Sequence, residues 1–167
     1  IPLVLNLYDN LPFWHSFFTN LGYEVILSDR SSKALYSLGQ HTIPSDTICY
    51  PAKLVHGHIQ SLIDKGLQTI FYPCMTYNVN EDMGDNHFNC PVVAYYPEVV
   101  EGNMNLEHVK FLYPYVYLED KRIFDQKMFE YFKARQMDIP FKDVQAASNH
   151  AYFAYQQFKD RVQDRKS

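Results

Sequence analysis

Short apolar runs alternate with amphipathic stretches along the first two thirds of the chain. The apolar runs, which are typical of buried strands, are Ile1–Leu7, Tyr23–Leu27, Leu67–Tyr72, Val92–Tyr96 and Val109–Tyr113. Between them lie stretches such as Pro51–Lys65, whose apolar residues recur with the period of a helix. This alternation predicts an α/β fold of three layers, with a parallel or mostly parallel sheet of four to five strands, Rossmann or flavodoxin-like, and helices on both faces.

The ends of the expected helices carry capping signals. Asn10 can cap a helix that follows it, and the chain closes with two expected helices, roughly Asp120–Gln136 and Pro140–Arg165. We therefore expect residues 1–118 to form the α/β domain with the cysteine site, and residues 119–167 to form a helical extension of the same domain.

The composition narrows the possible classes of function. Hydrophobic residues make up 47% of the 167 residues, which predicts a globular fold. The net charge is −4 and no long basic run is present, so nucleic acid is not an expected partner. No apolar run approaches the ~20 residues that span a bilayer, so no membrane association is expected. The chain holds no glycine-rich phosphate loop, so neither ATPase activity nor dinucleotide binding is expected of it.

The chain starts at Ile1 rather than at a methionine, so we expect it to be cut from a longer protein without a signal peptide. Its three cysteines are an odd number, which argues against a secreted disulfide framework and favours a reducing cytoplasm.

Three cysteines lie beside prolines in the middle of the chain. Cys49 precedes a predicted helix, whose N-terminus favours a thiolate, and Cys74 ends a predicted strand. Cys90 precedes the next predicted strand, so it reaches the same sheet edge only if the loop Met75–Asn89 folds back or if that strand starts later than Val92. We expect the three sulfurs to converge at the carboxyl edge of the sheet. The alternative is three unrelated buried cysteines, since their spacing matches no zinc or ferredoxin pattern.

Two histidines flank a glycine within the helix that follows Cys49. His56 and His58 are two residues apart, so they point to different sides of the helix and cannot form a facing metal pair. His58 falls near the apolar stripe and is expected to pack in the core. His56, together with Lys53, can face a pocket at the start of the helix; exposure on the surface is the alternative for His56. His87 is a candidate fourth metal ligand, and an exposed loop position is its alternative.

Four segments together resemble a known family. They read PFWHSFFTNLGYEVILSD, IPSDTICYPAKLVHGHI, IFYPC and DNHFNCPVVAYYPEVV. Across roughly Ile1–Val100 they resemble the domain downstream of the ATPase modules in the CoA-substrate-specific enzyme activase family. That domain is similar in turn to the iron–sulfur subunits of the 2-hydroxyacyl-CoA dehydratases. Beyond Leu106 the sequence shows no such resemblance.

The resemblance implies a cytoplasmic, oxygen-sensitive system. An ATPase activator module, in the same parent chain or complex, passes an electron to an iron–sulfur cluster of the 4Fe–4S type. Cys49, Cys74 and Cys90 match its three thiolate ligands, and an acyl-CoA is the implied substrate of the system. Lys53 and His56 would tune the cluster or meet an anionic group. We expect aerobic preparation to destroy the cluster.

Two features of this resemblance stay open. The ATPase part is absent from this chain, so the activase activity is not carried over, and whether the domain is catalytic or only relays electrons is undecided. The rival hypothesis is a metal-free interaction module that docks on the ATPase part of its parent protein. A zinc site completed by His87 is a third option.

Overall fold

The computed structural model describes residues 1–77 and 87–165, and its contacts group these residues into two units. Unit 1 comprises Ile1–Leu7 and Ile26–Glu119, and unit 2 comprises Tyr8–Val25 and Asp120–Ser167. The predicted grouping of 1–118 and 119–167 within one domain stays a prediction. No helix of the described residues is both long and apolar enough to cross a membrane.

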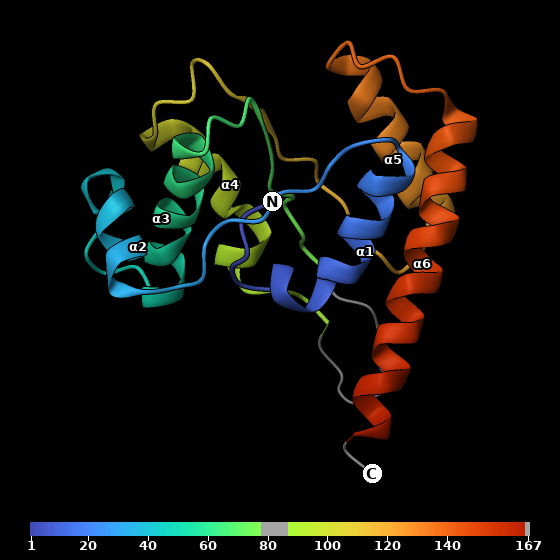
Figure 1. Cartoon of the computed structure of the whole chain (residues 1–167), viewed down its shortest axis with the longest axis horizontal. Coiled ribbons are helices and arrows are strands. Elements are labelled where there is room, and N and C mark those ends of the chain that lie inside the picture. The colour runs from blue at the N-terminus through green and yellow to red at the C-terminus, as the bar shows by residue number, and fades with distance from the viewer. Residues whose placement is uncertain (78–86, 166–167) are drawn as a thin grey trace. The chain divides into compact units, whose positions relative to one another are not determined.

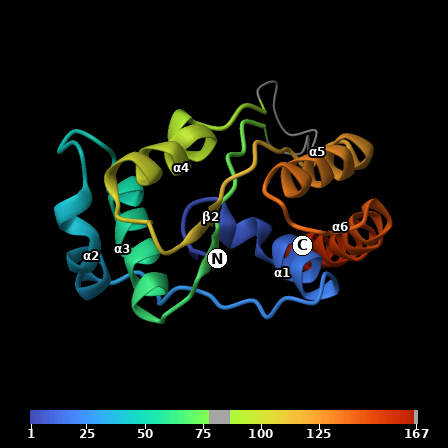
Figure 2. The same cartoon turned by 90° about the horizontal axis from the view of Figure 1, so that it is seen from above.

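Unit 1 is a short parallel strand pair with helices beside it. Its elements are α2 (Lys33–Gly39), a 3-10 turn (Gln40–Thr42), α3 (Tyr50–Asp64), β1 (Thr69–Phe71), α4 (Pro91–Asn103) and β2 (Lys110–Leu112). The strands pair in parallel with Ile70 opposite Phe111, and α4 connects them in a βαβ unit. Figures 1 and 2 both show α3 between α2 and the strand pair.

The predicted sheet of four to five strands is wrong. The described residues contain a single sheet, and it has two strands, β1 and β2. Each lies within a predicted run, Leu67–Tyr72 or Val109–Tyr113. Both strands stop early because Pro73 and Pro114 lack the N–H that a regular ladder uses. Pairing resumes only as an isolated bridge between Cys74 and Tyr115.

The first two predicted strands lie beside each other without forming a ladder. The Ile1 nitrogen donates to Ile26 O at 2.8 Å, and Ser28 N donates to Ile1 O at 3.2 Å. Pro2 cannot donate the next hydrogen bond, and Leu5 has a φ of 54°, in the left-handed region. These two residues end the extended segment, and the chain enters helix α1 at Leu7 instead of continuing as a strand.

The predicted strand Val92–Tyr96 is part of helix α4. Pro91 occupies the first turn of the helix, where its fixed φ favours a helical start. Pro97, inside the helix, cannot donate to the Val93 carbonyl, and Met75 N donates to that oxygen at 3.4 Å instead. The strand propensity of this run is thus overridden by its neighbours in space.

Helices α2 and α3 approach each other through two glycines. A Cβ on Gly39 would lie 2.2 Å from the backbone carbon of His56, and one on Gly57 would lie 2.1 Å from Leu35 O. Any side chain at either position would therefore push the two backbones apart. Gly57 is the residue between the two histidines, so this contact fixes the side of α3 on which α2 lies.

Unit 2 is a helical unit with an aromatic core. Its helices, which Figures 1 and 2 show side by side, are α1 (Leu7–Asn20), α5 (Lys121–Ala134) and α6 (Phe141–Asp164). The Phe13 ring meets Phe124 of α5 and Tyr152 of α6 edge-on, with centroids 5.1 and 5.0 Å apart. Asn10 lies within α1 rather than capping it, and accepts a hydrogen bond from Tyr155 at 3.1 Å.

Candidate functional site

Cys74 lies just beyond the carboxyl end of the parallel strand pair. Its N–H donates to Pro114 O at 2.9 Å, and its carbonyl accepts from Val116 N at 3.1 Å. The side chain is fully buried and is hydrogen-bonded to the Tyr115 hydroxyl, which donates its own proton to Glu98. This is the position in parallel α/β units where ligands bind.

Cys49 and Cys90 are the N-cap residues of α3 and α4, and both are exposed. Neither side chain makes a capping hydrogen bond. Each thiol therefore lies beside the N-terminus of a helix of more than ten residues. The sequence predicted this position for Cys49; for Cys90 it predicted a strand, and the helix start was missed.

The connections of these helices bring their N-termini to the same end of the strands. Residues 65–68 are all that join α3 to β1, so α3 ends where β1 begins and its N-terminus points the other way. Helix α4 follows β1 and runs back to β2, so it starts near the carboxyl end of β1. The ends of the Met75–Asn89 loop do fold back, because Asn89 N donates to Thr76 O at 3.0 Å; residues 78–86 of this loop lie outside the described residues.

Two buried tyrosines connect the three cysteines electrostatically. Burial raises the pKa of Tyr72, and Cys74, Tyr96 and Cys90 raise it further. Burial also raises the pKa of Tyr96 to about 12, with a further contribution from Cys49. Cys74 and Cys90 therefore interact electrostatically with the Tyr72 hydroxyl, and Cys49 with the Tyr96 hydroxyl. We call Cys49, Cys74, Cys90, Tyr72 and Tyr96 the cysteine edge.

The cysteine edge suits a thiolate-bound group chemically, but its thiols are not arranged as ligands. No three His, Cys, Asp or Glu side chains within residues 1–77 and 87–165 are grouped so that they could hold a metal ion. Burial raises the pKa of Cys74 to about 12, so this thiol is protonated at neutral pH. The observation that points to a missing partner is the Tyr72 hydroxyl, which is buried and without a hydrogen-bond partner among the described residues.

His56 is buried rather than exposed and joins α3 to α4. The Thr42 hydroxyl donates to Gly39 O at 2.8 Å, so it must accept from His56 Nδ1, at 2.7 Å. His56 Nε2 is then the acceptor for the Tyr96 hydroxyl, at 2.8 Å. Lys53, the other predicted cofactor-binding residue, instead donates to Asp46 O at 2.8 Å. His87 is half-buried, with its ring 5.8 Å from that of Tyr77.

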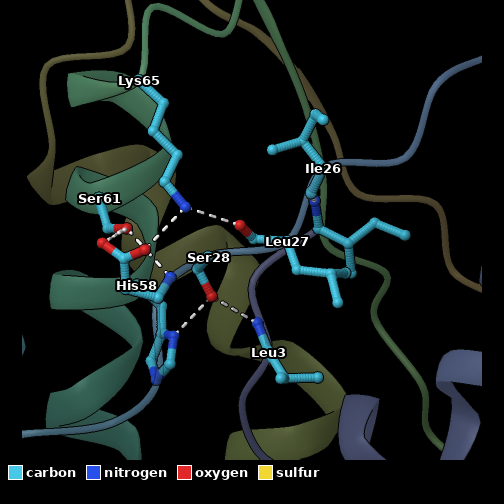
Figure 3. A network of polar contacts seen from close by, with 9 residues as sticks. Leu3, Ile26, Leu27, Ser28, His58, Ser61 and Lys65 are labelled. Carbon is cyan, nitrogen blue, oxygen red and sulfur yellow. Dashed lines mark hydrogen bonds and ion pairs between the residues drawn. The ribbon is translucent and has the colours of Figure 1, made fainter.

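His58 is a buried core histidine, as the sequence predicted, and it holds a second polar network (Figure 3). Its Nδ1 lies 2.6 Å from Ser28 Oγ, which accepts from Leu3 N at 2.8 Å. Its Nε2 lies 2.9 Å from Ser31 Oγ. Nearby, Lys65 pairs with Asp29 at 2.8 Å and donates to Leu27 O. Through Ser28, this network connects Leu3 of the N-terminal segment to His58 of α3.

The tyrosines of the cysteine edge were not among the predicted site residues. The signal for Tyr72 was present in Tyr72-Pro73-Cys74, because a buried tyrosine hydroxyl needs a partner. Nothing in the sequence indicated Tyr96, since Val92–Tyr96 was assigned to a strand.

Unit 1 is an α/β arrangement, a βαβ unit with cysteines near the carboxyl end of its strands, and this geometry does not by itself define a family. The family described as CoA enzyme activase uncharacterised domain matches residues 1–167, so the chain belongs to it. This confirms the resemblance and extends it to the C-terminal helices. No curated protein and no solved structure matches the chain.

Proposed function

We propose that this domain holds an iron–sulfur cluster of the 4Fe–4S type for a CoA enzyme activase system, with Cys49, Cys74 and Cys90 as thiolate ligands. The observation that carries the proposal is the position of Cys74 at the carboxyl end of β1 and β2, together with the interactions of all three cysteines with two buried tyrosines. When bound, such a cluster supplies one-electron transfer.

The properties of the three thiols support this assignment. Cys49 and Cys90 are exposed N-caps, so they can move toward Cys74 when a cluster binds. Cys74 is protonated in the present arrangement, and a coordinated metal would displace its proton outright. Binding would therefore release a proton at Cys74 and draw the three sulfurs together. His56, through Tyr96, and Lys53 would position this end of α3 rather than bind iron.

The description of the family suggests a partner, a substrate and a compartment for this domain. The description of the family names a CoA enzyme activase. We therefore propose that an ATPase activator module of the same system is the partner of this domain, and that an acyl-CoA is the substrate of the system. The cytoplasm, whose reducing conditions preserve thiolates, is the compartment that suits such a site.

A second candidate is a metal-free module that docks on the ATPase part of its parent protein. The observation that favours it is that the described residues contain no group able to hold a metal ion as they stand. In this case the cysteines would be ordinary packing and surface residues.

Cys→Ser variants at positions 49, 74 and 90 separate the two candidates. After reconstitution with iron and sulfide without oxygen, each should lose the broad ~400 nm absorption and iron content of the wild type. Serine is a favoured N-cap, so the apo forms of Cys49→Ser and Cys90→Ser should be as stable as the wild type or more. Apo Cys74→Ser should lose about 1–3 kcal/mol, because its buried hydroxyl is poorly partnered.

The control is Thr47→Ser, an exposed change two residues before Cys49, which should keep the absorption and the iron. A wild type that stays colourless and free of iron after reconstitution would refute the cluster and favour the docking module. Iron retained in all three cysteine variants would refute these ligands.

A further inference from the structure

Helices α5 and α6 bury two polar atoms that have no hydrogen-bond partner among the described residues. They are Oδ1 of Asp125, on α5, and the hydroxyl of Tyr152, on α6. Asp125 is only 2% exposed, although a carboxylate is among the groups most costly to bury. Buried polar atoms are almost always hydrogen-bonded, so each of these two atoms indicates a missing partner.

The packing of the two helices brings these groups to the same level of unit 2. Only residues 135–140 join α5 to α6, so the two helices run antiparallel as a helical hairpin. Phe124, the residue before Asp125, meets the Tyr152 ring edge-on at a centroid distance of 6.0 Å, and both residues of α5 are on its buried face. Burial raises the pKa of Tyr152, and Asp125 raises it further. The acceptor and the donor therefore lie near each other in the core.

The charge of Asp125 is already balanced, and this decides the kind of partner. Lys121 Nζ donates to Asp125 Oδ2 at 2.5 Å, so one oxygen of the carboxylate has its counterion and the other offers an unused acceptor. Burial keeps the Tyr152 phenol neutral and therefore a donor. A neutral group that accepts from the hydroxyl and donates to the carboxylate satisfies both atoms, and a single water molecule does so.

We propose that one buried water molecule binds between Tyr152 and Asp125, accepts from the hydroxyl and donates to Oδ1, and so joins α6 to α5 within the aromatic core of unit 2. The inference goes beyond the proposed function and does not depend on it, because it concerns unit 2 and involves no cysteine. Lys121, Asp125, the water and Tyr152 then form one continuous chain of hydrogen bonds. A fully satisfied buried network of this kind makes a core more rigid and specifies a single packing of its elements.

A double-mutant cycle on the whole chain, followed by denaturant unfolding, tests this link. Tyr152→Phe should raise the unfolding equilibrium constant about tenfold, because it leaves the water and the carboxylate with one partner fewer. In an Asp125→Ala background the same change should have an effect of less than about twofold, since the bridge is already broken. The control is Tyr8→Phe, at an exposed tyrosine of unit 2, which should leave unfolding unchanged. A Tyr152→Phe protein as stable as the wild type, or more stable, would overturn the inference.

A second measurement uses the wild-type chain and needs no variant to fold. A high-resolution crystal structure should contain an ordered water within about 3.2 Å of both the Tyr152 hydroxyl and Asp125 Oδ1. A direct hydrogen bond between the two side chains, an ion in place of the water, or two atoms that stay without a partner would each overturn the inference.

Discussion

His56 and His58, two residues apart in α3, form hydrogen bonds with residues on the two sides of α2. His58 bonds Ser31, just before α2, and His56 bonds Thr42, just after it. Both rings are fully buried, and desolvation lowers the pKa of each to about 4. Burial therefore favours the neutral form of both rings.

Acid should weaken the protein through His58. Its pKa is about 4 in the folded protein and about 6.5 in the unfolded chain, so the stabilisation is complete above pH 6.5 and falls as the pH drops toward 4. The loss should reach about 3 kcal/mol, at 1.36 kcal/mol per pKa unit. Denaturant unfolding between pH 7 and 4.5 measures it. His58→Gln should remove about half of the total pH dependence, because the pKa of His56 is lowered to about 4 as well. Exposed His15→Gln should leave the slope unchanged, and equal slopes for His58→Gln and wild type would contradict the argument.

At the scale of elements, the close approach of α2 and α3 depends on the absence of two side chains. Gly39 and Gly57 each place backbone atoms of the opposite helix where a Cβ would be. In the sequence, Gly57 reads as an unfavourable residue in the middle of a helix, which costs about 1 kcal/mol relative to alanine. The packing between α2 and α3 explains why it is present.

Gly57→Ala should destabilise the protein in spite of alanine's higher helix propensity. The new Cβ would lie 2.1 Å from Leu35 O, a backbone atom, so α2 must move away. We expect a loss of about 3 kcal/mol, as for overpacking in a core. The matched control is Gly102→Ala in α4, where a Cβ meets nothing within 4 Å, and it should gain up to about 1 kcal/mol. Thermal and denaturant unfolding measure both changes, and an unaltered or more stable Gly57→Ala would refute the close packing.

At the scale of the molecule, each unit has a hydrophobic core of its own. The core of unit 2 is aromatic and includes Trp14, the single tryptophan of the chain, which is fully buried. The core of unit 1 includes the fully buried Cys74. Trp14 fluorescence and the reactivity of the Cys74 thiol therefore report on different units.

Phe13→Ala should unfold unit 2 first. The ring of Phe13 contacts those of Trp14, Phe124 and Tyr152, all within unit 2, and its removal should cost about 3–5 kcal/mol. The denaturant midpoint from Trp14 fluorescence should fall more than the midpoint from Cys74 thiol labelling. Equal shifts of both midpoints would show that the chain unfolds as one cooperative unit.

Local chemistry determined where the helices lie. Ser32 caps α2, Pro91 occupies the first turn of α4, and Gly22 and Gly66 follow α1 and α3 with positive φ. The sequence alone predicted α3, α5 and α6, together with β1, β2 and the position of Cys49, because caps, prolines and glycines act within a few residues.

Tertiary structure decided the sheet and the surroundings of the cysteines. Whether an apolar run becomes a strand depends on a partner that can complete its hydrogen bonds, so Ile1–Leu7 and Val92–Tyr96 could not be assigned from their own residues. The hydrogen bond from Tyr96 to His56 joins residues 40 positions apart in the chain, and Tyr72 interacts electrostatically with Tyr96, Cys74 and Cys90. Such contacts cannot be predicted from local sequence, because only the folded chain brings these groups within reach of one another.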